Sequence, residues 1–503
     1  MRRVIATALL IGLTSWSCVS RIQRKVGVSL ATVDLKAAYL KAHMKSGELF
    51  VLSKWSIDES ARVIFGTGEL YGLGRGQGIP GDYRVPFDQV ALYETNTVEI
   101  SPVVAAMSVI TGISVAVSVA CLSNPKACFG SCPTFYATTD DGERVLQAEG
   151  FSDSIAPSLE ANDIDALWQS TGRGGELSLL MTNEAYETHV IKQADLLAIP
   201  RPPGGRVLVE GGRFWAASSL RAPTQCTSAA GDCRDEVRAL DHRERTTLTS
   251  EEDLAARETI DLAFAPAAPG ERVAIVLGAR QTLVTTFLLY QGLAYLGTTA
   301  TSWLARAESG ASLSKGLDLS KLLGGIEVQV RRDGAWETLG QAYETGPIAT
   351  DVHTVMLPEG VTGEALRLRL PRGGWRLDYV ALATIDQEVT PLRVSPTRIR
   401  GELSRDFGPG RTAAAALPIV TVPGDEYTLE YHLPPGETYD LFLDSRGYYL
   451  EWMRQEWMRE ERPLAALRML LDPQQALRDL APEFKKLEPQ AEELFWRSRY
   501  ARP

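Results

Sequence analysis

The sequence predicts a mainly β protein of several domains, with α-helices confined to a few segments. Three observations lead to this fold class. Short apolar and β-branched runs alternate with turn residues along most of the chain, which is the pattern of antiparallel strands. The chain has 503 residues, enough for about three domains at ~150 residues each. Helical spacing of apolar residues is limited to short stretches. We therefore expect small β-barrel and β-sandwich modules, one apolar helix and a helical C-terminal tail.

The composition is that of a globular protein with an acidic balance of charge. Hydrophobic residues make up 45% and charged residues 23% of the chain, which excludes wholesale disorder and collagen-like repetition. Lys and Arg number 52 against 63 Asp and Glu, so the net charge is −11. Neutralisation of phosphates by basic residues dominates the affinity of nucleic-acid binders. Because the sequence has no basic block, we expect no nucleic-acid partner.

Residues 1–18 have the features of a bacterial export signal. Two arginines follow the initiator methionine, then comes the uncharged apolar run Val4–Leu13, and small residues precede Cys18. The junction before Cys18 resembles the lipobox of bacterial lipoproteins, although Ser15 stands where that pattern prefers Leu. The resemblance implies that Cys18 is diacylated and becomes the mature N-terminus, which would anchor the protein without a membrane span. Ordinary signal cleavage near Ser17, which would leave Cys18 as a free or paired thiol, is the alternative.

The remaining cysteines predict local disulfides. Export makes disulfides permissible, and the nearest pairs are Cys128 with Cys132 and Cys226 with Cys233, which leaves Cys121 within an apolar run. Zinc is the competing interpretation. Neither spacing is the usual Cys-x2-Cys, and no histidine lies close beside either pair. We therefore expect disulfides and no metal site.

Residues 33–100 predict a small β-barrel. Turn residues separate the expected strands, which lie at 40–45, 49–52, 61–65 and 85–92. For the first of these, a short helix is the alternative. The order of a basic segment, a Ser46-Gly47 turn, a long hairpin and a final Val-Pro-Phe-Asp-Gln-Val strand resembles Sm-like or SH3-like barrels.

Residues 102–123 are expected to form an apolar helix. The run Val103–Leu122 has no charged residue over its twenty positions, so its length alone would allow a membrane span. An anchored N-terminus followed by one span would return every later domain to the cytoplasm. We therefore favour a helix buried between domains or contacting a membrane. A true span, in a subunit of a membrane complex, is the alternative.

Two β-rich segments follow, over residues 128–310 and 311–440. The first contains short strands and a predicted helix over 282–303. In the second, Ile326–Val330 alternates strictly between apolar and polar residues, and Asp333-Gly334 is a strong hairpin turn.

Residues 366–370 alternate again, and the strand 375–382 follows after a short turn. This pattern resembles the galactose-binding-like β-sandwiches of secreted multidomain proteins. Together with residues 128–300 it also resembles the β modules that accompany FG-GAP-type repeat proteins of bacterial envelopes. The resemblance covers roughly half of the chain. It implies an envelope protein in which the sandwich around residues 311–390 could bind a glycan.

Residues 445–503 predict a helical C-terminal region. Asp472 is placed to cap a helix that has Pro473 in its first turn, with Pro482 expected to interrupt it. Trp452 and Trp457 lie upstream at near-helical spacing. They predict either an amphipathic helix that docks on the preceding sandwich or a surface that faces a partner or a membrane.

No catalytic motif is present in the sequence. It lacks a phosphate-binding Gly-x-x-x-x-Gly-Lys-Ser/Thr loop, a His-Glu-x-x-His helix and a Gly-x-Ser-x-Gly elbow. The sequence does not exclude a pair of catalytic carboxylates of the glycosidase type, because the distance between two carboxylates depends on the tertiary fold. The five histidines are scattered, without ligand spacing: His43, His189, His242, His353 and His432. We therefore expect no catalytic residue, no metal and no cofactor.

The leading hypothesis is an exported lipoprotein of the bacterial cell envelope. It would be anchored in the outer membrane through Cys18, and would act by binding or assembly with an envelope protein or a glycan. One alternative is a carbohydrate-binding or carbohydrate-active protein. The other is a membrane-complex subunit with a single span.

Overall fold

The protein is mainly β, as the sequence predicts. Strands hold 54% and helices 14% of the structure, which confirms the predicted fold class. The computed structural model describes residues 20–27, 30–44, 48–72, 78–100, 132–139, 141–152, 154, 160–185, 187–297, 300, 324–343, 346–401, 418–451 and 460–497.

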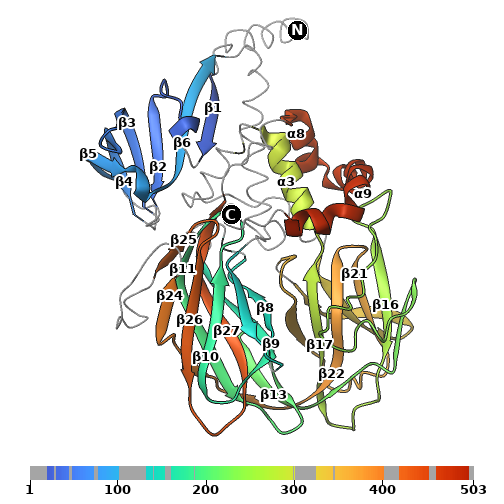
Figure 1. Ribbon diagram of the computed structural model, residues 1–503. Coiled ribbons are helices and arrows are strands. Elements are labelled where there is room, and N and C mark those ends of the chain that lie inside the picture. The colour runs from blue at the N-terminus through green and yellow to red at the C-terminus, as the bar shows by residue number, and fades with distance from the viewer. Residues whose placement is uncertain are drawn as a thin grey trace, which may run out of the picture.

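The N-terminal unit is a six-stranded antiparallel sheet (Figure 1). Its strands are β1 (Ser20–Gly27), β2 (Tyr39–Met44), β3 (Leu49–Asp58), β4 (Val63–Tyr71), β5 (Ile79–Pro86) and β6 (Val90–Ile100). The strand order is β1-β6-β2-β3-β4-β5, so β6 returns to pair with β2 and the sheet is nearly closed and barrel-like. Leu40, Ala42 and Met44 are buried and Tyr39 is exposed. This alternation is why residues 39–44 form a strand and not the alternative helix.

Sandwich 1 consists of residues 132–200 and 392–451. One sheet has the order β24-β26-β10-β7-β8 and the other β23-β11-β27-β9, with β25 also paired to β11. Its strands are β7 (Thr134–Thr138), β8 (Arg144–Glu149), β9 (Ala161–Gly172), β10 (Gly175–Thr182), β11 (Glu187–Pro200), β23 (Leu392–Val394), β24 (Arg398–Gly401), β25 (Ile419–Thr421), β26 (Glu426–Leu433) and β27 (Tyr439–Glu451). Phe135, Leu179 and Leu429 of the first sheet pack against Leu196 and Leu443 of the second.

Sandwich 2 consists of residues 206–389. Its sheets have the orders β12-β13-β22-β17-β20 and β15-β14-β16-β21-β18-β19. The strands are β12 (Arg206–Glu210), β13 (Arg213–Arg221), β14 (Gln225–Ser228), β15 (Gly231–Asp232), β16 (Arg257–Ala263), β17 (Arg272–Gln281), β18 (Ile326–Arg332), β19 (Ala335–Ala342), β20 (Asp351–Met356), β21 (Leu366–Pro371) and β22 (Trp375–Val389). Ile275 and Leu382 of one sheet meet Ile260 and Leu368 of the other in its core.

Sandwich 2 is inserted into sandwich 1, between β11 and β23. The expected division at residues 310/311 therefore does not separate two sheets, because β17 pairs with β22 across it. The expected helical region from residue 445 is also wrong at its start, since β27 extends to Glu451. Almost every residue of β27 is buried. A strand that is covered on both faces lacks the alternation by which strands are recognised in a sequence.

The two sandwiches pack face to face, so the four sheets form four layers (Figure 1). Consecutive residues of β17 face two different cores. Ile275 points into sandwich 2, whereas Ala274 and Val276 belong to the interface with sandwich 1. In the same interface, the rings of Phe214 and Phe442 meet edge to face at 5.0 Å between centroids. This shared apolar layer sets the orientation of the sandwiches.

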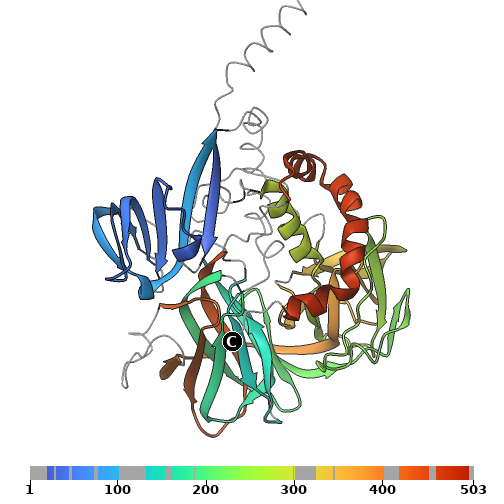
Figure 2. The same ribbon diagram turned by 45° about the horizontal axis from the view of Figure 1, so that its top comes forward.

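Three helices gather at one end of sandwich 2 (Figure 2). They are α3 (Val284–Leu296), α8 (Pro463–Leu471) and α9 (Pro473–Arg497). Leu288 of α3 packs with Leu477 and Phe484 of α9. Asp472 caps α9 as predicted, because its Oδ1 accepts the N–H of Gln475 at 3.1 Å. The expected interruption at Pro482 is wrong, since α9 continues through that residue.

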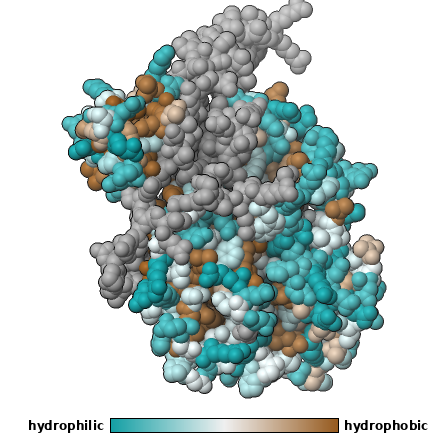
Figure 3. Space-filling model, viewed as in Figure 1, coloured by the Kyte–Doolittle hydropathy of each residue, from teal (hydrophilic) through white to brown (hydrophobic). Residues whose placement is uncertain are grey.

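Several predicted features lie outside the described residues: Cys18, the helix 102–123 with Val103–Leu122, Cys128, Trp452 and Trp457. None of the helices in the described part of the chain has both the length and the hydrophobicity that a membrane span requires. The visible face of the two sandwiches is largely hydrophilic, with apolar residues interspersed (Figure 3).

Candidate functional site

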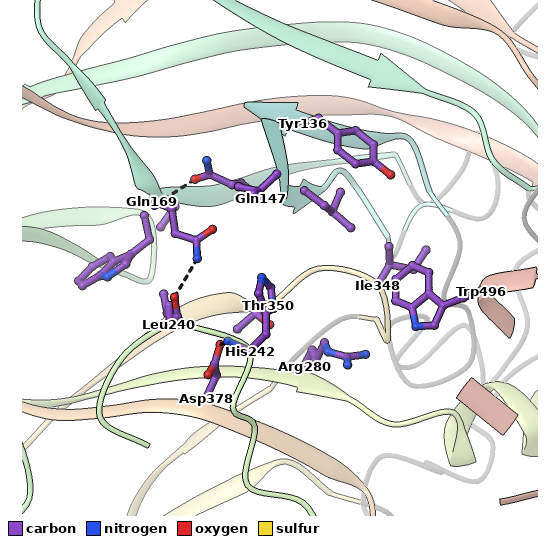
Figure 4. A pocket seen from close by; sticks show the side chains of 14 residues that line it. Tyr136, Gln147, Gln169, Leu240, His242, Arg280, Ile348, Thr350, Asp378 and Trp496 are labelled. Atoms are coloured by element: carbon purple, nitrogen blue, oxygen red, sulfur yellow. Dashed lines mark hydrogen bonds between the residues drawn. The ribbon is translucent and has the colours of Figure 1, made fainter. Parts of the chain in front are cut away.

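A pocket of about 310 Å3 lies where the two sandwiches and α9 meet (Figure 4). Sandwich 1 contributes Tyr136, Gln147 and Gln169 to its lining, from β7, β8 and β9. Val145, Leu146, Ala166 and Trp168 of the same sandwich also line it, and the remaining wall comes from sandwich 2 and from Trp496 of α9. The volume is at the lower end of the range of small-molecule sites, which is roughly 300–1,000 Å3.

Two glutamines form the polar wall on sandwich 1. The Nε2 group of Gln147 donates to Oγ of Ser170 at 2.6 Å, and its Oε1 accepts the backbone N–H of Gln169 at 3.0 Å. The Nε2 group of Gln169 donates across the pocket to the carbonyl oxygen of Leu240 at 2.9 Å. Gln147 therefore holds β8 against β9, and Gln169 joins the two sandwiches.

On sandwich 2, a loop over residues 238–245 places His242 at the pocket. Bridges from Arg238 to Tyr379 and from Arg245 to Leu377 hold the loop along β22. Between them, Asp378 accepts the backbone N–H of Asp241 at 3.4 Å and of His242 at 3.1 Å.

His242 has a φ of 64°, a left-handed conformation that histidine adopts more readily than most residues. Burial raises the pKa of Asp378, and the two N–H donors partly offset this effect. The Asp378 carboxylate thus fixes the loop that carries the His242 ring.

Two arginines and two glutamates attach α9 to the pocket. Arg280 pairs with Glu244 at 2.5 Å and with Glu492 of α9 at 2.8 Å. Arg376 also pairs with both glutamates. Burial and the neighbouring Arg280 lower the pKa of Arg376, and Glu244 opposes the shift. Trp496 lies four residues after Glu492, on the same face of the helix, so the ion pairs place its ring at the pocket.

The aromatic residues of the pocket differ in their surroundings. One face of Trp168 is covered by the guanidinium of Arg206, 3.8 Å from the ring centroid, and the ring of Tyr379 lies 5.8 Å away. Burial raises the pKa of Tyr379 to about 12. Tyr136 donates its hydroxyl to Glu184 at 2.7 Å. Trp168 therefore belongs to the sandwich interface, while Trp496 supplies a ring on the third wall.

The arrangement is suited to holding a small ligand. Polar side chains and aromatic rings converge on one pocket from three segments that are themselves held by hydrogen bonds and ion pairs. Both oxygens of Asp378 already accept backbone N–H groups, so this carboxylate acts on the loop. Within the described residues, no cluster of His, Cys, Asp or Glu could hold a metal ion.

Of the site residues predicted from the sequence, the structure describes Cys132, Cys226 and Cys233, and these lie outside the pocket. Cys226 and Cys233 form the predicted disulfide, which is buried in the core of sandwich 2. Cys132 is buried just before β7. Of the pocket residues, the sequence drew attention only to His242, as one of the scattered histidines. Gln169, Thr350 and Trp496 carry no local signal, because the pocket exists only when the sandwiches and α9 are packed together.

No family model matches the chain, and no curated protein matches it.

Proposed function

We propose that the protein is an exported lipoprotein of the bacterial cell envelope that binds a small ligand in the pocket between its sandwiches. The observation that carries the binding role is the pocket itself, about 310 Å3 in volume and lined by both sandwiches and α9. Pockets of this kind occur preferentially where domains meet. Binding is favoured over assembly because the converging polar groups lie within the pocket and not on a flat surface.

The walls of the pocket support binding because they are already organised. Gln169 joins the two sandwiches through Leu240, and Arg280 joins sandwich 2 to Glu492 of α9. A site whose groups are held in place loses less conformational entropy on binding than a mobile one. This rigidity favours a specific ligand.

Export is supported by the sequence and by the disulfide. The basic start, the apolar run and the lipobox-like Cys18 motivate the lipid anchor. The Cys226–Cys233 disulfide is consistent with an oxidising compartment such as the periplasm.

The anchor is tested by mass spectrometry of the mature N-terminus from fractionated cells. We expect a diacylated Cys18 and recovery in the outer membrane, with a Cys18→Ala variant lost from that fraction. An unlipidated N-terminus at another residue would overturn the anchor. Recovery of the lipid-free protein in the inner membrane would support the single-span alternative.

The binding role is tested by saturation-transfer NMR on the full mature chain, in a detergent without a sugar headgroup. The probes are neutral hexoses and N-acetylhexosamines, the anions phosphate and acetate, and the cation ethanolamine. A Thr350→Phe variant places a ring in the pocket, and Thr259→Phe makes the same change at an exposed position of β16. We expect at least one probe class to bind the wild type and Thr259→Phe but not Thr350→Phe. If no probe binds, or if Thr350→Phe has no effect, the pocket is not the functional site.

A further inference from the structure

The pocket offers hydrogen-bonding groups that the protein does not use. In the part of the chain that the structure describes, no hydrogen bond occupies the His242 ring, the Thr350 hydroxyl or the amide oxygen of Gln169. These three groups come from different segments and line the same pocket. Figure 4 shows Gln169 on one side, with Thr350 and His242 on the other. A ligand there would meet hydrogen-bonding partners on opposite sides.

The charges around the pocket favour a neutral ligand. Arg280 and Arg376 are matched by Glu244 and Glu492, and each arginine contacts both carboxylates. An anion such as phosphate would have to compete with these carboxylates for the guanidinium groups. A cation would find the oxygens of Asp378 already accepting two backbone N–H groups. A charged ligand of either sign would therefore have to displace a partner that is already bound.

Apolar surface completes the recognition chemistry. Leu146, Ile348 and the ring of Trp496 line the pocket together with the polar groups. A pyranose ring has hydroxyl groups around its edge and C–H groups on its faces. It therefore needs hydrogen-bonding side chains and an aromatic surface in the same small site, and a tryptophan presents the largest such surface.

We propose that this pocket binds a neutral sugar ring of a glycan, with Trp496 stacking on the ring and Gln169, His242 and Thr350 hydrogen-bonding its hydroxyl groups. The proposal rests on the binding role of the pocket argued above and names its ligand class. The size of the pocket suits one or two sugar rings. In this proposal Trp496 contacts the sugar directly, and the ion pairs of Glu492 hold α9 where its Trp496 ring reaches the pocket.

The test measures affinities for neutral hexoses, N-acetylhexosamines and their disaccharides by calorimetry on the full mature chain. We expect Trp496→Ala to weaken the best sugar about tenfold, because it removes the stacking surface. Thr350→Val should weaken binding about fivefold through the loss of one hydrogen bond. Trp336→Ala is the matched control, since this tryptophan lies on β19 and pairs with Arg367 outside the pocket.

Two further measurements keep the outcomes distinct. Trp496→Phe retains an aromatic ring, so its affinity for the sugar should lie within about threefold of the wild-type affinity. This variant keeps the stacking role testable even if Trp496→Ala fails to fold. Binding of phosphate, acetate or ethanolamine but of no sugar would overturn the sugar proposal and leave the binding role intact. Sugar binding that Trp496→Ala and Thr350→Val leave unchanged would also overturn it. Absence of any bound probe would remove both proposals.

Discussion

The guanidinium of Arg206 lies 3.8 Å from the centroid of the Trp168 ring, across the boundary between the two sandwiches. It also pairs with Asp440 of β27 at 2.8 Å. The same carboxylate pairs with Arg201 at 2.7 Å and accepts the backbone N–H of Val207 at 2.7 Å. Burial lowers the pKa of Arg206, and Asp440 opposes that shift. The buried carboxylate of Asp440 thus holds both the linker after β11, through Arg201, and the start of β12, through Arg206 and Val207, against sandwich 1.

Replacing Arg206 should destabilise the protein. In Arg206→Ala, Asp440 keeps its burial but loses one of its two cations, so we expect the free energy of unfolding to fall by about 3 kcal/mol. Urea denaturation monitored by tryptophan fluorescence would measure the loss. Arg213→Ala is the control, because Arg213 also pairs with a carboxylate and lies over a tryptophan, but at an exposed site. Equal losses in the two variants would contradict the role given to Arg206.

The disulfide of sandwich 2 should contribute measurably to stability. Cys226 and Cys233 are separated by 7 positions in the sequence. Closing this short loop lowers the conformational entropy of the unfolded chain, which raises the free energy of unfolding by about 2 kcal/mol. The double variant Cys226→Ala/Cys233→Ala should therefore unfold at a lower temperature than the wild type. Reductant should lower the melting temperature of the wild type and leave the double variant unchanged. A wild type that is insensitive to reductant after complete reduction would refute the prediction.

Local rules predicted well those features that depend on neighbouring residues alone. Asp333 and Gly334 have φ values of 50° and 83°, the left-handed pair that a two-residue hairpin between β18 and β19 requires. Asp472 caps α9 for the same reason, because the cap and the group it satisfies are three residues apart. The short loop between Cys226 and Cys233 likewise favoured a local disulfide.

Features that depend on long-range packing were missed. The insertion of sandwich 2 into sandwich 1 is a property of strand pairing, such as β11 with β27, and pairing leaves no mark in either strand alone. The pocket was missed for the same reason. Gln169 and Trp496 are separated by more than half of the chain, and only the docking of α9 brings them to one site.

The buried His189 should make stability depend on pH. Its ring lies 3.1 Å from Glu187. Burial lowers its pKa to about 3, although Glu451 and Asp425 act in the opposite direction. Between pH 6.5 and 3 the unfolded chain therefore takes up a proton that the folded chain does not. His189 should therefore lower the free energy of unfolding by about 1.4 kcal/mol for each pH unit of acidification in that window.

Urea denaturation at intervals between pH 6 and 4 would test this dependence. We expect His189→Gln to reduce the slope of stability against pH by about 1.4 kcal/mol per unit. His432→Gln, at an exposed position, should keep the slope of the wild type. Identical slopes in all three proteins would show that His189 does not titrate in this way.

The docking of α9 on the pocket should depend on Glu492. In Glu492→Gln, Arg280 and Arg376 would share Glu244 alone, and the excess positive charge should loosen the end of the helix that carries Trp496. We expect amide hydrogen exchange over residues 488–497 to quicken about tenfold, as measured by mass spectrometry.

Glu483→Gln is the matched control for this change, because it removes a carboxylate from the same helix at an exposed pair with Lys486. Its exchange over residues 488–497 should equal that of the wild type. Equal exchange in Glu492→Gln and Glu483→Gln would mean that apolar packing of Leu477, Leu480 and Phe484 holds the whole helix. Faster exchange in Glu492→Gln alone, together with weaker binding of a pocket ligand, would show that the ion pairs and the third wall of the pocket act as one unit.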